Sequence, residues 1–169
     1  MNDLPWNGHR DGYRSTNLID EIVVDADYDN PKVWVPLADG VMLRPMMFDI
    51  TNGAWSSILR IAAGKSLACH YHTQPVHGFT VKGSWRYLEH NWVASNGTYI
   101  FEPPGELHTL VADAKDGMTT FFVTRGSLIY TDEAGKQIGY EDVFTRLALC
   151  RRHFQEAGFE SETIERMIR

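Results

Sequence analysis

Cysteine and positive charge are both scarce in this chain of 169 residues, and no long hydrophobic run occurs in it. Its two cysteines, Cys69 and Cys150, are too few for a disulfide framework or a four-cysteine zinc site. The net charge of −6, from 16 basic and 22 acidic residues, argues against binding to nucleic acids or anionic membrane surfaces. No segment approaches the roughly 20 apolar residues of a membrane span, and the first residues lack the apolar stretch of a signal peptide. These absences predict a cytoplasmic protein with no nucleic-acid or membrane partner.

The remaining composition, 43% hydrophobic and 22% charged, is ordinary for one globular domain. Between residues 31 and 140, short runs rich in β-branched and aromatic residues alternate with turn pairs such as Asn52-Gly53 and Asn96-Gly97. This alternation predicts many antiparallel strands folded into a barrel or sandwich. The expected strands are Val33–Val35, Val41–Ile50, Trp55–Ala62, Ser66–His72, Val76–Val81, Ser84–Glu89, Thr98–Phe101, Leu107–Val111, Thr119–Val123 and Ser127–Tyr130.

The two segments that flank this strand-rich region have a different composition and a different spacing of apolar residues. Residues 1–30 are polar and acidic, and we expect them to form a mostly irregular arm. Residues 141–169 are expected to form a helical tail, with one helix ended by Gly158 and a second capped by Ser161. The apolar spacing that predicts the first helix is given by Phe144, Leu147, Ala148, Arg151 and Phe154. The sequence therefore predicts an all-β single domain with an N-terminal arm and a short C-terminal helical tail.

Histidine is concentrated in two places that bear on function. His70 and His72 are separated by one residue on an expected strand, so both imidazoles project from one face within reach of a single ion. His77 follows a turn that resets this alternation, and it is able to return to the same cavity. His108 begins a later expected strand, after a Pro-Pro-Gly turn. The other three histidines read as ordinary surface or hydrogen-bonded residues.

Two multi-point patterns surround these histidines. Their positions are Gly64, His70, His72, His77 and Gly83 in the first pattern, and Gly97, Pro103, Gly105 and His108 in the second. Together they resemble the two motifs of the cupin superfamily, whose members are small jelly-roll β-barrels. The second motif matches without a gap. The first departs twice, because His77 stands where the family usually has glutamate and the interval to Gly83 is one residue short.

The resemblance implies that His70, His72 and His108 are metal ligands. His77 then either ligates the metal or contacts substrate or water, and Glu102 and Glu106 are expected to face solvent or cap a turn. Three neutral imidazoles leave the charge of a divalent ion uncompensated and coordination positions free, which favours an anionic bidentate substrate beside O₂. Iron(II) is preferred because it passes electrons to O₂, although zinc or another divalent metal suits the same ligands.

Within the cupins, the all-histidine site and the single small barrel with a helical tail resemble the 2,4′-dihydroxyacetophenone dioxygenase family. Members of that family are homo-oligomeric iron enzymes that use O₂ to cleave an aryl α-hydroxyketone to 4-hydroxybenzoate and formate. The resemblance implies this substrate, a dimer or tetramer, and His77 as the base that removes the substrate proton. Candidate substrate contacts are Trp85, Tyr99, Phe101 and Arg60, with Tyr87 beside them. Each of these residues alone is more often found in core packing or in an exposed salt bridge.

Three alternatives stay open at this point. The first is a cupin dioxygenase that cleaves β-diketones, and the second is a metal-dependent isomerase or decarboxylase of the same fold. The third is a zinc-binding cupin sensor module without catalysis. Such sensor modules usually carry an additional helical domain, and the sequence outside the expected barrel is short for one.

Overall fold

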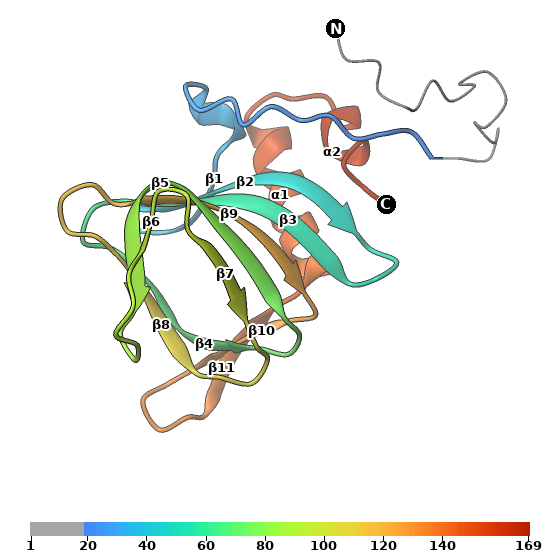
Figure 1. The fold of residues 1–169 in the computed structure, drawn as a ribbon. Coiled ribbons are helices and arrows are strands. Elements are labelled where there is room, and N and C mark those ends of the chain that lie inside the picture. The colour runs from blue at the N-terminus through green and yellow to red at the C-terminus, as the bar shows by residue number, and fades with distance from the viewer. Residues whose placement is uncertain (1–18) are drawn as a thin grey trace, which may run out of the picture.

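The structure is a computed structural model that describes residues 19–169 (Figure 1). The first 18 residues of the expected arm lie outside the described residues, and residues 19–30 run without helix or strand. The barrel strands in chain order are β1 (Val35–Ala38), β2 (Val41–Asp49), β3 (Ala54–Ile61), β4 (Ser66–His72), β5 (Val76–Tyr87), β6 (Ala94–Ser95), β7 (Tyr99–Glu102), β8 (His108–Ala112), β9 (Met118–Arg125), β10 (Leu128–Thr131) and β11 (Gln137–Glu141). The helical elements are a 3₁₀ turn, η1 (Pro31–Val33), and the helices α1 (Val143–Glu156) and α2 (Glu162–Glu165).

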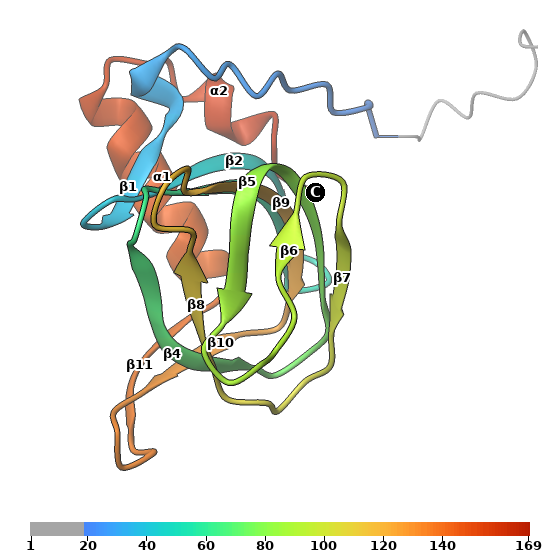
Figure 2. The ribbon, with the colours of Figure 1, turned by 60° about the vertical axis from the view of Figure 1, so that its left-hand side comes forward.

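The strands pair antiparallel in the order β1-β2-β3-β9-β5-β8-β4-β10-β11, with β6 and β7 both pairing with β5. The first half of β5 pairs with β9, and its second half pairs with β8, so one strand belongs to two sheet halves. The sheet bends along this path into a barrel that encloses a core (Figures 1 and 2). The predicted all-β jelly-roll fold is confirmed.

Strand β5 is one long strand where the sequence predicts two. A register shift between Thr80 and Lys82 lets the strand continue, and Gly83 follows with a φ of +75°. A Cβ atom at Gly83 would lie 2.1 Å from the carbonyl oxygen of Gly117. Glycine is therefore required here, because any side chain would collide with the backbone just before β9.

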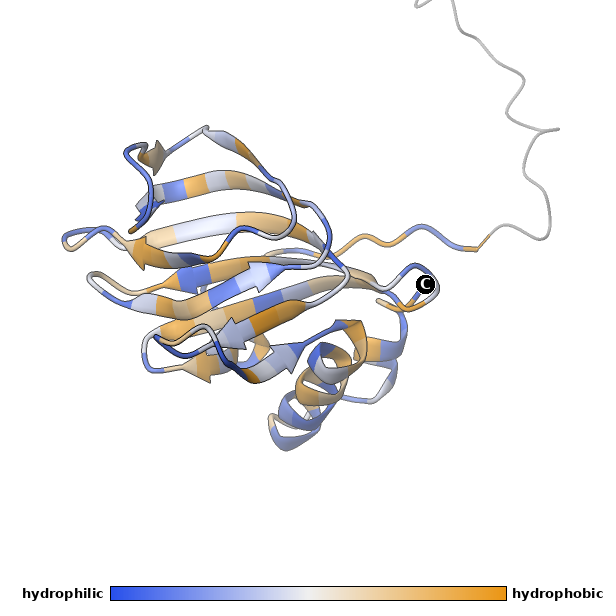
Figure 3. Cartoon of the chain, turned by 90° about the horizontal axis from the view of Figure 1, so that it is seen from below, coloured by the Kyte–Doolittle hydropathy of each residue, from blue (hydrophilic) through white to orange (hydrophobic). Residues whose placement is uncertain are grey.

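Along most strands, hydrophobic and hydrophilic residues alternate, as Figure 3 shows. Leu43, Leu59 and Phe122 point into the barrel from one sheet half, and Leu110 and Leu128 point into it from the other. The alternation predicted from the sequence thus sets which side chains face the interior. The pairing register also decides which polar residues reach the interior.

Helix α1 packs against β1, β2 and β11, which lie at the two ends of the sheet path. Asp142 and Thr145 form a reciprocal capping box at its N-terminus. Its buried face carries Arg146, Leu147 and Cys150, whereas Phe144 is 60% exposed. The face of the helix that packs on the sheet therefore differs from the face that the apolar spacing predicts. Among residues 19–169 no helix is long and apolar enough to cross a membrane.

Candidate metal centre

Three histidines from two neighbouring strands converge inside the barrel. His70 and His72 project inward from β4, and His108 lies directly opposite His70 on β8. One ring nitrogen of each lies within 4.8 Å of the others, and all three residues are at most 4% exposed. The structure therefore brings together the three residues that the sequence motifs single out.

The hydrogen bonds around the cluster leave imidazole nitrogens free toward its centre. Nδ1 of His70 lies 2.7 Å from the carbonyl oxygen of Ala68, which only accepts, so Nδ1 carries the proton and Nε2 keeps its lone pair. Nε2 of His108 is buried and has no hydrogen-bond partner among the described residues. Tyr87 stacks on the His108 ring at 3.9 Å with an interplanar angle of 4°, which fixes the orientation of that ring.

Glu102 joins the cluster, in contrast to the expectation that it faces solvent or caps a turn. It is 4% exposed, and its Oε2 lies 3.1 Å from Nε2 of His72 and 3.8 Å from Nε2 of His108. Strand β7 extends to Glu102, which pairs with inward-facing Val76 on β5. The expected strand ended one residue earlier, at Phe101, and this hid the inward position of the carboxylate. Glu106, in contrast, is exposed, and its Oε1 lies 3.2 Å from Nε2 of His90.

Burial sets the protonation states of the cluster. Burial, followed by the repulsion of a neighbouring imidazole, lowers the pKa of His70 to about 4 and that of His108 to about 3. Burial raises the pKa of Glu102, but His72, a hydrogen bond from Tyr87 and the nearby His108 together lower it, and the net direction is downward. At neutral pH the metal-free site therefore holds neutral His70 and His108 beside a carboxylate. Imidazole and carboxylate donors with unpaired buried atoms fit a divalent ion such as iron(II) or zinc.

A cavity of about 50 Å³ adjoins the cluster. Its polar lining residues include His70, His72, Glu102, Tyr87 and Arg146. The apolar part of its wall comes from Leu37, Leu43, Trp55, Leu59, Leu67, Val76, Leu110, Phe122 and Leu128. The site is thus a small apolar chamber with polar groups at its ends, a typical arrangement for a small-molecule site.

His77, Tyr99 and Phe101 lie on the outer face of the barrel. Val76 faces the cavity, so His77, the next residue on β5, faces away from it. Nδ1 of His77 lies 2.8 Å from the hydroxyl of Tyr99, and its ring centroid is 5.5 Å from that of Phe101. Tyr99 and Phe101 are 60% and 53% exposed. The structure does not bring these three residues to the metal centre.

Trp85 and Arg60 also lie away from the cavity. Trp85 is buried behind the cavity wall, donates from its indole nitrogen to Thr80 Oγ1 at 2.9 Å, and packs edge-on against Tyr87. The guanidinium carbon of Arg60 lies 3.9 Å from the centre of the Trp34 ring, in a cation–π contact near the N-terminal segment. Among the candidate aromatic contacts, Tyr87 is the one that lines the cavity.

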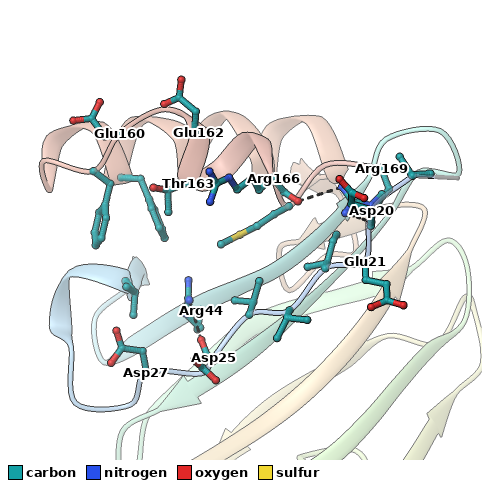
Figure 4. A pocket seen from close by; sticks show the side chains of 18 residues that line it. Asp20, Glu21, Asp25, Asp27, Arg44, Glu160, Glu162, Thr163, Arg166 and Arg169 are labelled. Atoms are coloured by element: carbon teal, nitrogen blue, oxygen red, sulfur yellow. Dashed lines mark hydrogen bonds between the residues drawn. The ribbon is translucent and has the colours of Figure 1, made fainter. Parts of the chain in front are cut away.

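A larger cavity, of about 1580 Å³, lies elsewhere among residues 19–169. Figure 4 shows it between the N-terminal segment, β2 and the α2 region, where Arg44 donates to the backbone carbonyl of Asp25. None of the described residues that line it is a histidine or cysteine. It therefore lacks the chemistry of the histidine cluster despite its size.

An antiparallel barrel with histidines converging on its interior is the architecture of a cupin. The sequence profile of the ChrR cupin-like domain matches residues 21–129, and the chain belongs to this cupin family. No curated protein sequence matches the chain. The family match thus covers the barrel as far as the start of β10 and contains all three clustered histidines.

Solved structures agree with this assignment. An RmlC-like cupin protein from Ralstonia eutropha JMP134 is 31% identical, with a TM-score of 0.71, over 75% of this chain and 84% of that chain. An acetylacetone dioxygenase from Acinetobacter johnsonii is 21% identical, with a TM-score of 0.70, over 81% of this chain and 95% of that chain. The similarity to the acetylacetone dioxygenase, at 21% identity, is one of fold.

Proposed function

We propose that the chain is a metal-dependent dioxygenase that uses O₂ to cleave a carbon–carbon bond in a small substrate with two neighbouring oxygen atoms. The buried cluster of His70, His72, His108 and Glu102 beside a small apolar chamber is the observation that carries this proposal. Four donors leave two positions free on an octahedral ion, enough for a bidentate substrate or for O₂. Iron(II), when bound there, would supply electrons to O₂, which zinc does not.

The likeness in fold to an acetylacetone dioxygenase supports this choice, because it extends over 95% of that chain. Acetylacetone is a β-diketone with two oxygens placed for one metal ion. An aryl α-hydroxyketone, the substrate class predicted from the sequence, also has two such oxygens. The two classes therefore share the chemistry that the centre requires.

The size of the chamber favours the β-diketone class. A cavity of about 50 Å³ holds only a few water molecules, so a compact substrate fits more readily than one with an aryl ring. Of the residues expected to form the aryl slot, Trp85, Tyr99 and Phe101 are absent from the chamber wall, and its aromatic residues are Tyr87, Trp55 and Phe122. Cleavage of 2,4′-dihydroxyacetophenone stays a prediction that the experiment below tests.

We assign Glu102 the proton-accepting role that the sequence analysis gives to His77. The Glu102 carboxylate is buried beside the histidine cluster, where it stays ionised, and its Oε2 lies 3.1 Å from Nε2 of His72. A carboxylate held this way can accept a proton from the acidic carbon between two carbonyl groups. The leucine-rich wall of the chamber keeps bulk water from competing for that proton.

Oxygen uptake tests the proposal. Iron(II)-loaded protein should consume O₂ with acetylacetone, and a parallel assay with 2,4′-dihydroxyacetophenone measures the aryl alternative. H108A should abolish uptake and iron binding, whereas H90Q, which changes a histidine outside the cluster, should keep both. Equal turnover with and without O₂, or no uptake with either compound, would contradict a dioxygenase.

A zinc-binding regulatory module is the second candidate. Glu102 is the observation that favours it, because three imidazoles and one carboxylate can close a tetrahedral zinc site with no open position. Stoichiometric zinc in protein purified without added metal, together with no oxygen uptake after iron loading, would support this function.

A homo-oligomer remains a proposal, which sedimentation of the purified protein tests.

A further inference from the structure

Helix α1 places a permanent positive charge against the chamber of the metal centre. Arg146 is 4% exposed and lines the same cavity as His70 and His72. Its Nη2 pairs with the carboxylate of Glu141 on β11. Its Nε and Nη1 are buried and have no hydrogen-bond partner anywhere in residues 19–169.

The surroundings of Arg146 tie it to the histidine cluster. The Tyr130 hydroxyl donates to Glu141 Oε2 at 3.0 Å, and the Tyr130 ring lies 5.6 Å from the ring of His70. Tyr130 also sits directly opposite His70 in the pairing of β10 with β4. Arg146, Glu141 and Tyr130 therefore form a connected group that begins at the helix and ends against the metal centre.

The charge balance of the chamber leaves room for an anion. Arginine stays protonated when buried, and Glu141 compensates its charge. Glu102 then offsets half the charge of a divalent ion, and one positive charge is left over. Arg146 lines a chamber with a mostly apolar wall, and its Nε and Nη1 are buried without a partner, where an unmade charged hydrogen bond is costly. A planar guanidinium with free N–H groups matches the geometry of a carboxylate.

We propose that Arg146 binds a carboxylate group of the substrate, so that the preferred substrate is a small β-diketone with a terminal carboxylate. This inference rests on the proposed function, since the diketone oxygens are held at the histidine cluster. The compound 2,4-dioxopentanoate is a suitable probe, because it is acetylacetone with one methyl group replaced by a carboxylate. The two compounds form a matched pair that differs only at the end assigned to Arg146.

Arg44 provides a matched control for the loss of a buried arginine. It is 6% exposed, and its Nε and Nη1 likewise lack partners within the described chain. It lies on β2, lines the large cavity of Figure 4 and is not among the residues that line the metal chamber. R44Q therefore removes a comparable group without touching the proposed carboxylate site.

Calorimetric titration of zinc-loaded protein measures binding without turnover. Wild-type protein should bind 2,4-dioxopentanoate more tightly than acetylacetone. R146Q should lower the affinity for 2,4-dioxopentanoate by about 10- to 100-fold, as expected for a lost charged hydrogen bond. R146Q should leave the zinc content and the acetylacetone affinity within about twofold. R44Q should keep the wild-type preference. If R146Q is poorly folded, R146Q/E141Q removes the buried pair together and is measured in its place.

The outcomes separate the two proposals. Equal affinity of wild-type protein for both compounds, or an unchanged preference in R146Q, overturns the role of Arg146 and leaves the proposed function standing. An Arg146-dependent preference in the zinc form, with no oxygen uptake in the iron form, upholds the carboxylate site and refutes the dioxygenase. Protein that binds no metal overturns both.

Discussion

The metal-free protein should lose stability as the pH falls from about 6.5 toward 4, because it buries histidines in their neutral form. The pKa of His70 drops from its ordinary value of 6.5 to about 4 on folding. At a pH between these two pKa values, His70 is protonated in the unfolded chain and neutral in the folded chain, so acid favours unfolding. The difference corresponds to about 3 kcal/mol for this one residue. The stability is fully present above pH 6.5 and lost once the pH reaches about 4.

Urea unfolding of metal-free protein at a series of pH values measures this effect. The free energy of unfolding should fall by about 3 kcal/mol or more between pH 7 and pH 4, since the pKa of His108 is lowered in the same direction. H70N should show a shallower dependence, and H90Q should keep the wild-type slope. A free energy of unfolding that stays constant from pH 7 to pH 5 would refute the argument that these imidazoles are buried and neutral.

Three further predictions concern single residues. H108A should lose bound metal while its circular dichroism spectrum stays that of a folded barrel. H77A should keep its metal, since His77 faces outward. Metal loss in H77A would contradict that placement. E102Q should lower metal affinity by about 10- to 100-fold in a chelator competition, and an unchanged affinity would separate Glu102 from the metal. G83A should cost more than about 1 kcal/mol in urea unfolding, because its methyl group meets the Gly117 carbonyl, whereas G135A, with open space around it, should cost less.

The part of the site that lies within one strand could be predicted from the sequence. His70 and His72 share a face by alternation alone, and the spacing of the second motif added His108. The inward turn of Glu102 could not be predicted, because it depends on β7 running one residue further and on its register with β5. The same register turns His77 and Phe101 outward as a cross-strand pair. Periodicity gives the alternation of a strand, but its neighbours decide which side faces in.

The helical tail shows a similar limit. Apolar spacing predicts a helix ended by Gly158, and the structure has α1 ending at Glu156 with Gly158 at a φ of +84°. The same spacing places Phe144 on the packed face, yet Phe144 is exposed and Arg146 is buried. A buried arginine carries no apolar signal in a sequence, so its position emerges only when the helix is packed against the sheet ends.

The proposed role of Arg146 would place part of the ligand choice on α1, outside the 21–129 segment that matches the family and carries the candidate metal ligands. Relatives that keep the barrel but exchange this helix would hold the same ion while accepting different molecules. Grafting α1 onto another family member would therefore test whether ligand selectivity moves with the helix while the histidine cluster is kept.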